Sequence, residues 1–419
     1  MRARDEAVGW SAVTSAASAT RFAPPRQAVR ARMGTLMLFA TNGLTFASLI
    51  PRYPEIKADL GASQTLWGLA VGIGPIGGLA LGLATARLMS RFGSRNVAAW
   101  PQILSTAGLL LMANAPHVGW VFVAMIAMSA FDAVTDTAMN YQALRVQEMY
   151  KRSIINTFHG WWSVGAVLGG FIGSAMAQWR VDINLQASLT MVVLALVCAL
   201  SWSLMLPGRD TGTDRSTSDG DQRRARVPAT TWLHIIGLGL LGALAGGIEI
   251  GGSTWAPLYM DAQFNSTPFI AGMGFTILMV AETAGRLIGD LIVNRFGQAF
   301  AVAQGSVICL VGMAVAIAWP TTASTLIGFA AAGWGVATII PLAMNVADSL
   351  PGVRSGAGLT IATWVMRLGF MLFPIGIGAL GDAVALRWAM ICLPAGALVM
   401  LALVPLVGAG RRRRAPEAV

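Results

Sequence analysis

Two carboxylates and an amide lie at four-residue spacing inside an apolar stretch of the chain. On a helix, Asp132, Asp136 and Asn140 would form one stripe, because side chains four positions apart lie one above the other. Charge at membrane depth is costly unless it faces water or a partner. Since burial favours the neutral acid, a carboxyl there could load and release a proton, and we expect Asp136 and Asp132 to do so. The alternatives are a static pair bonded to nearby threonines or backbone, and a position of Asp136 close to the membrane surface.

A second polar group follows at Phe158-His159-Gly160-Trp161-Trp162-Ser163. The imidazole of His159 could bind a solute or relay a proton near neutral pH. Trp162, three positions later, would share its helix face. The alternatives are a histidine satisfied within the structure and a tryptophan that packs or anchors at the membrane surface.

Two buried charges mark the second half of the chain, Glu249 and Arg367. Arg367 has no hydrated loop within easy reach, so it needs either a carboxylate or an anionic solute. Glu249 or Glu282 could neutralise it. The first apolar segment contributes the polar side chain of Asn42. We expect Asn42, His159, Trp162, Glu249 and Arg367 to line one cavity.

The composition explains why such a cavity is needed. Of the 419 residues, 55% are hydrophobic and 11% are charged, against about 25% charged in soluble domains. The chain is therefore expected to be an all-α, polytopic membrane protein. Twelve apolar segments have roughly the length of a bilayer crossing: 33–51, 65–87, 97–115, 118–140, 155–178, 185–206, 232–255, 268–290, 299–319, 322–346, 356–380 and 385–407.

Polar stretches divide these segments. We expect a disordered tail over 1–32, a six-helix bundle over 33–206, a flexible linker over 207–231, a second six-helix bundle over 232–407, and a basic tail over 408–419.

The net charge of +10 arises from basic residues between the apolar segments. Only Arg52, Lys57, Arg180 and Arg387 fall in the loops on the side opposite the termini. This bias predicts that both termini are cytoplasmic, in the cell inner (plasma) membrane. Because topology accounts for the charge, we expect no nucleic-acid partner. Cys198, Cys309 and Cys392 lack metal-ligand spacing, and we expect no metal, cofactor or disulfide framework.

The two halves repeat each other. Arg91-Phe92-Gly93 recurs as Arg295-Phe296-Gly297, 204 positions later, and Ala138-Met139-Asn140 recurs as Ala343-Met344-Asn345, 205 positions later. Such duplication is typical of transporters whose two bundles enclose a midplane site. Pro341 and Ala337 take the places of Asp136 and Asp132 in the second copy. The acids thus belong to one half, where we place the function.

From about 33 to 407 the chain resembles the major facilitator superfamily. That family carries a glycine-led, Asp-Arg-x-Gly-Arg-like motif between its second and third helices. Here Ser90 and Asn294 stand where the two copies would have the aspartate, although Asp290 is kept at the helix end. The resemblance implies that a group of residues on the cytoplasmic side acts as a gate. The alternative is that the arginines of this group only set the topology. The group consists of Arg91, Gly93, Arg95, Asp290, Arg295 and Gly297.

In detail the chain is most similar to the fucose-permease-like branch and its uncharacterised bacterial inner-membrane relatives. The matching residues are Asp136-Thr-Ala-Met-Asn140, Phe158-His159-(x)3-Ser163-x-Gly165, Glu249 with Trp255 and Tyr259, Gly285-Arg286-x-x-Gly289-Asp290, and Gly369-Phe370 with Phe373-Pro374. In sugar permeases of that branch, an acid at the Asp136 position is implicated in proton coupling, and a polar residue at the His159 position lies near the substrate. Their acid in the first segment is absent here, around Ala47, which disfavours a sugar.

A glycine-rich run, Gly165-(x)3-Gly169-Gly170-x-Ile172-Gly173-Ser174, also resembles the motif of proton-antiporting exporters. Gly170 and Ser174 replace that motif's proline and last glycine, and close helix packing would use the same spacing.

Together these features predict a monomeric secondary transporter. It would move a small organic solute by alternating access, coupled to protons. The alternatives are a proton-antiporting drug or metabolite exporter and, less favoured, a membrane sensor that transports nothing. An enzyme is not expected, because the accessible loops show no nucleotide-binding glycine loop, metal cluster or nucleophile triad.

Overall fold

The structure is a computed structural model that describes residues 24–208, 229–348, 350 and 357–408. All regular structure within these ranges is helical. Most of the predicted terminal tails and linker lies outside the described residues.

The first half contains nine α-helices and one short 3-10 helix. They are α1 (Arg26–Ala47), η1 (Ile50–Arg52), α2 (Tyr53–Asp59), α3 (Gln64–Gly72), α4 (Gly74–Gly82), α5 (Thr85–Phe92), α6 (Ser94–Ala113), α7 (Val118–Tyr150), α8 (Ile155–Gln178) and α9 (Ile183–Leu204).

The second half contains eight helices in its described part. They are α10 (Ala229–Phe264), α11 (Pro268–Phe296), α12 (Gln298–Ala318), α13 (Thr322–Val336), α14 (Ile339–Asp348), α15 (Ala357–Ala383), α16 (Leu386–Ala389) and α17 (Cys392–Gly408).

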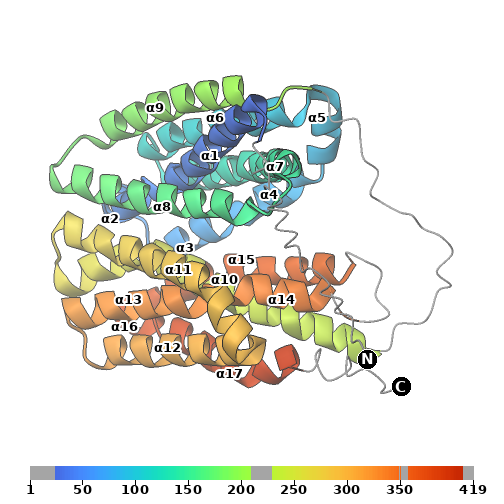
Figure 1. Cartoon of the computed structure of the whole chain (residues 1–419). Coiled ribbons are helices and arrows are strands. Elements are labelled where there is room, and N and C mark those ends of the chain that lie inside the picture. The colour runs from blue at the N-terminus through green and yellow to red at the C-terminus, as the bar shows by residue number, and fades with distance from the viewer. Residues whose placement is uncertain (1–23, 209–228, 349, 351–356, 409–419) are drawn as a thin grey trace, which may run out of the picture.

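Each half forms its own group of helices, α1–α9 and α10–α17, and the two groups lie side by side (Figure 1). We call the end of the molecule where α9 stops and α10 starts the linker end. The opposite end, where α8 and α15 stop and α3 and α11 start, is the far end.

Ten helical segments in the described part are long and apolar enough to cross a membrane. The other two predicted crossings coincide with α8 and α11, which are long helices outside that set. The protein is therefore a multi-pass membrane protein, but the count of twelve crossings is not confirmed. Three crossings are broken into shorter helices, at α3–α4, α13–α14 and α16–α17; Pro75 lies in the first turn of α4.

Several helices are longer than the segments predicted from the sequence. The first helix starts at Arg26 rather than at 33, because Pro25 precedes it at the N-cap and no glycine or proline interrupts 26–33. Helix α7 runs on to Tyr150 for the same reason, since the stretch after Asn140 also lacks a helix breaker.

The halves contact each other through glycines near the far end. A Cβ atom added to Gly68 of α3 would lie 2.4 Å from the carbonyl oxygen of Pro374 in α15. On the other side, one added to Gly272 of α11 would lie 2.1 Å from the Ser174 hydroxyl of α8. Toward the linker end α4 packs on α7 instead, where a Cβ on Gly77 would meet the Ile126 carbonyl at 2.0 Å. The contact that α3 and α4 make with α15 of the other half is therefore concentrated near the far end.

Candidate functional site

Asn42 is the hub of a hydrogen-bond network that joins four helices of the first half. Its amide nitrogen donates to Asp132 Oδ1 on α7 at 2.7 Å and to Gln102 Oε1 on α6 at 2.8 Å. The indole nitrogen of Trp162 on α8 donates to Asn42 Oδ1 at 2.8 Å. Asn42 itself, on α1, is 5% exposed. The structure therefore brings Asn42, Asp132 and Trp162 together.

Gln102 extends this network and is fully buried. Its amide nitrogen donates to the hydroxyls of Thr45 at 3.0 Å and Thr106 at 3.4 Å, and the two hydroxyls lie 3.2 Å apart. Such a connected network fixes the orientation of each amide. The carboxyl of Asp132 is therefore held by a donor that is itself held in place.

Asp136 lies one turn further along the same stripe of α7, and its side chain is exposed. Asn140 Nδ2 donates to Asp136 Oδ1 at 3.0 Å and to the Asp136 carbonyl at 2.9 Å. Among the described residues this neighbour on its own helix is the one hydrogen-bond partner of the carboxylate. Since Asp132 on the same stripe faces α1, Asp136 faces the interior of the protein rather than lipid. Thr137, the adjacent threonine, bonds the Ala133 carbonyl instead of an acid.

His159 faces the other half of the molecule. Its exposed ring packs edge-on against Phe39 of α1, with centroids 5.3 Å apart, and it interacts electrostatically with Arg286 of α11. Of the two tryptophans that follow, Trp162 reaches Asn42 while Trp161 is 46% exposed.

An ion cluster centred on Arg286 occupies the second half. Its guanidinium contacts the carboxylate of Glu282, one turn earlier on α11, and lies 3.7 Å from Glu249 Oε1 on α10. Glu282 is 1% exposed, whereas the Arg286 side chain is 37% exposed. The suggested neutralisation of Arg367 by Glu249 or Glu282 is therefore wrong, because both carboxylates pair with Arg286.

Arg367 is half-buried on α15. Within the part of the chain that the structure describes, it has neither an ion pair nor a hydrogen bond.

The residues expected to form a gate lie apart from this site, at the linker end. Gly93 and Gly297 connect α5 to α6 and α11 to α12, with φ of 81° and 90° that favour glycine. The Arg95 guanidinium stacks on the Trp202 ring of its own half, 4.4 Å from the centroid. Arg91 and Arg295 lie over the rings of Phe92 and Phe296. Asp290 is exposed and forms no ion pair with a described residue. The gating role stays a prediction.

The glycine-rich run of α8 packs against α1. A Cβ on Gly165 would lie 2.0 Å from the Ala40 carbonyl oxygen, and one on Gly173 would lie 2.3 Å from that of Ser48. Gly170 and Ser174 face the other half, against Phe275 and Gly272. Close packing is therefore a sufficient reason for most of this run.

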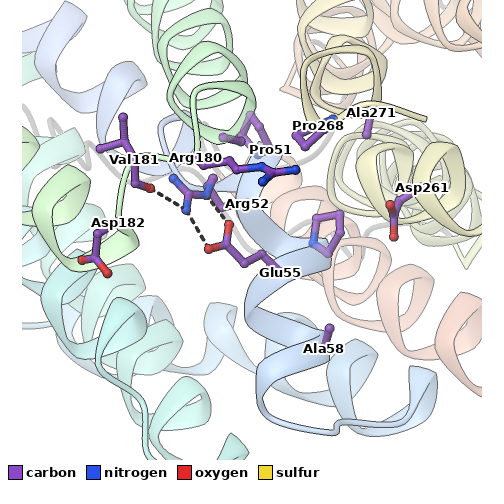
Figure 2. A pocket seen from close by; sticks show the side chains of 12 residues that line it. Pro51, Arg52, Glu55, Ala58, Arg180, Val181, Asp182, Asp261, Pro268 and Ala271 are labelled. Carbon is purple, nitrogen blue, oxygen red and sulfur yellow. Dashed lines mark hydrogen bonds and ion pairs between the residues drawn. The ribbon is translucent and has the colours of Figure 1, made fainter. Parts of the chain in front are cut away.

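A pocket of about 560 Å³ opens between the halves at the far end (Figure 2). Its most buried charge, Arg52, is 2% exposed. Each nitrogen of the guanidinium has a partner: the group donates to Glu55 at 2.5 and 2.7 Å, to Gln186 Oε1 at 2.7 Å and to the Val181 carbonyl at 3.0 Å. Arg52 therefore fixes the loops around the pocket and is not free to bind a ligand.

Five residues of the hydrogen-bond network and the ion cluster were not among the predicted site residues: Thr45, Gln102, Thr106, Glu282 and Arg286. Gln102 follows Pro101 within an apolar segment, and a buried amide there needs a partner. Glu282 and Arg286 are spaced like a helical ion pair. Both patterns were visible in the sequence.

Repeated halves of long apolar helices, with polar side chains directed toward the interior of the molecule, define a multi-pass membrane transport protein. The chain belongs to the Major Facilitator Superfamily, whose family model matches residues 35–303.

Relatives and solved structures agree with this assignment. An uncharacterised MFS-type transporter of Yersinia pestis is 27% identical over 86% of this chain and 91% of its own length. The membrane protein MosC of Rhizobium meliloti is 26% identical, covering 84% of each chain. Among solved structures, a bacterial homologue of the human lysosomal transporter Spinster, inward-facing and unoccupied, superposes with a TM-score of 0.76 at 13% identity, over 94% of this chain and all of the other. The nucleoside transporter NupG gives a TM-score of 0.67 at 12% identity, over 92% and 99% of the two chains. At such identity the likeness establishes the fold.

Proposed function

We propose that the protein is a secondary active transporter that moves a small organic solute by alternating access, with Asp136 carrying the coupled proton. The observation that carries this proposal is the exposed carboxylate of Asp136 on an otherwise satisfied polar stripe of α7. A carboxylate with one donor, on its own helix, can change protonation without breaking a contact between helices.

Asp132 would transmit that change. Protonation of Asp136 removes a negative charge one helical turn from Asp132. Asp132 is tied through Asn42 to α1, α6 and α8, so a shift of α7 reaches every helix of the network. His159 and Trp162 of α8 and Glu249 and Arg367 of the second half would line the solute path.

Orientation follows from the basic residues. We place the linker end in the cytoplasm of the inner membrane, since most lysines and arginines gather there. The inter-half glycine contacts, which lie near the far end, would then stand on the outer side of the membrane.

The test is transport in proteoliposomes with an imposed pH gradient and a panel of labelled solutes. Wild-type protein should couple solute movement to proton flux, and Asp136→Asn should abolish the coupling. Asp59→Asn, an exposed carboxylate at the far end, is the control. Coupled flux that survives Asp136→Asn would refute the assignment of Asp136. Reversing the gradient distinguishes uptake from proton-antiporting export, and failure of every solute to move would favour the sensor alternative.

A further inference from the structure

Arg367 lies on the stripe of α15 that faces the first half. One and two turns later on this helix, the carbonyl oxygens of Met371 and Pro374 approach Gly72 and Gly68 of α3. A Cβ atom on those glycines would lie 2.6 and 2.4 Å from these oxygens. With 3.6 residues per turn, Arg367 falls on the same stripe, one turn nearer the linker end.

Helix α3 does not extend to that turn, and α4, which follows it, makes only a few contacts with α15. Helix α3 ends at Gly72, and α4 packs on α7 through Gly77 and Gly78. Helical side chains lean toward the N-terminus of their helix, and α15 starts at the linker end. The guanidinium of Arg367 is therefore directed into the space between the halves.

Its charge is not compensated from within the described part of the chain. Glu249 and Glu282 pair with Arg286, Asp132 accepts from Asn42, and Asp136 accepts from Asn140. An arginine side chain does not lose its proton in proteins, so the charge persists at membrane depth.

We propose that Arg367 binds an oxyanion of the transported solute, which is therefore a small organic acid or phosphate ester. This inference rests on the proposed transport function. A guanidinium binds a carboxylate or phosphate through two parallel hydrogen bonds, which position as well as hold the ligand. Uptake of a monoanion with one proton on Asp136 would carry no net charge across the membrane.

Matched acidic and neutral compounds test the proposal on the purified protein by thermal shift. The pairs are galacturonate with galactose, glycerate with glycerol, and glucose 6-phosphate with glucose, so the carboxylate and phosphate arms are separate. Acidic members should stabilise the wild type, and Arg367→Gln should weaken their binding roughly 10- to 100-fold. Arg367→Lys should recover part of the affinity, while Arg180→Gln, at an exposed far-end arginine, should bind normally.

Stabilisation by neutral members only, acid binding that survives Arg367→Gln, or no response to any acid would each overturn the proposal. Failure of the two proposals can be told apart. Proton-coupled transport of a neutral solute removes the anion site alone. Arg367-dependent acid binding without any transport removes the transport function alone.

A second inference comes from hydrogen bonds that join the halves at the far end. The Asp382 carboxylate, at the end of α15, accepts from the backbone N–H of Gln64 at 2.9 Å and of Thr65 at 2.8 Å. These are the first two residues of α3. The first N–H groups of a helix have no partner within it, so this carboxylate from the other half caps α3.

The same contact occurs a second time with the halves exchanged. Gln178 Oε1, at the end of α8, accepts from the N–H of Phe269 in the first turn of α11 at 3.2 Å. Asp382 follows Gln178 by 204 positions, and Phe269 follows Thr65 by 204 positions. The repeated Arg-Phe-Gly motif has the same offset.

We infer that Asp382 and Gln178 are paired latches that hold the far end closed. Separating the halves there would remove the acceptors of the Gln64, Thr65 and Phe269 N–H groups together, while Ser63 would still accept from Leu66 N–H within α3. Asp382 is the stronger latch, because it is charged and accepts two N–H groups, whereas Gln178 is neutral and accepts one.

Spin labels at Asn114 and Ala323 report on far-end opening, since both are exposed there on opposite halves. Cys392, the one native cysteine that is not fully buried, is replaced first. Asp382→Ala should raise the population of the longer distance roughly tenfold, Gln178→Ala less, and the double variant most. Asp182→Ala is the matched control, because Asp182 caps α9 of its own half through Asn184 and Leu185. A distance distribution for Asp382→Ala that matches the one for Asp182→Ala would overturn the latch.

Discussion

Replacing Asn42 with alanine removes the hub of the polar network while leaving α1 intact. Three hydrogen bonds between helices are lost, to Asp132, Gln102 and Trp162. Such bonds contribute on average about 0.6 kcal/mol each in a membrane protein, with a maximum of about 1.7. The expected loss in the free energy of unfolding is therefore about 2 kcal/mol, with an upper bound of about 5.

Reversible unfolding in mixed micelles measures this loss, followed by tryptophan fluorescence. Asn114→Ala is the matched control, since Asn114 is exposed and bonds only the Leu110 carbonyl of its own helix. It should change the stability by less than about 0.5 kcal/mol. Equal stabilities for the two variants would show that the network around Asn42 does not hold the first half together.

Three further predictions concern packing and charge. Gly165→Ala should be destabilised by about 1–3 kcal/mol relative to Gly160→Ala in thermal unfolding, because a Cβ at Gly165 meets the Ala40 carbonyl while nothing lies within 4 Å of one at Gly160; equal stabilities would contradict the close approach of α1 and α8. Arg286→Gln should lower the free energy of unfolding by about 3–5 kcal/mol, because it leaves the buried Glu282 carboxylate without its cation. Adding Glu282→Gln should restore part of that stability, and no recovery in the double variant would contradict the ion pair. Arg387→Gln should lower the unfolding midpoint more than Arg180→Gln does, because Arg387 donates to the Ile317 and Ala318 carbonyls at the end of α12; an equal shift would rule out that C-cap.

Most of the fold could be predicted from the sequence, because long apolar segments with basic flanks have few alternatives in a membrane. Helix ends were less predictable. The extension of α7 to Tyr150 runs past the apolar segment, and hydropathy carries no information about a helix that continues into water. Breaks such as the one before Gly74 depend on local packing as well as on Pro75.

The site was only partly predictable. Periodicity placed Asp132 and Asp136 on one stripe, and it placed Trp162 rather than Trp161 beside the other polar groups. Pairing across helices was not predictable. The sequence spacing allowed Glu249 to pair with either Arg286 or Arg367, and Glu249 pairs with Arg286 because α10 packs on α11. The latch contacts were also beyond sequence reasoning, because Asp382 and Gln64 are far apart in the chain.

The glycine contact between α3 and α15 has a consequence for the speed of a transport cycle. At Gly68 and Gly378 the two backbones touch with no side chains between them, so parting them at this point exposes little apolar surface to water, although Ile375 packs on Gly72 one turn away. A contact of this kind closes the path sterically yet adds little to the barrier for opening. The two conformations of a carrier must lie within a few kcal/mol of each other for both to be visited in each turnover. A seam of leucines in the same place would seal equally well and would hold the carrier in one state.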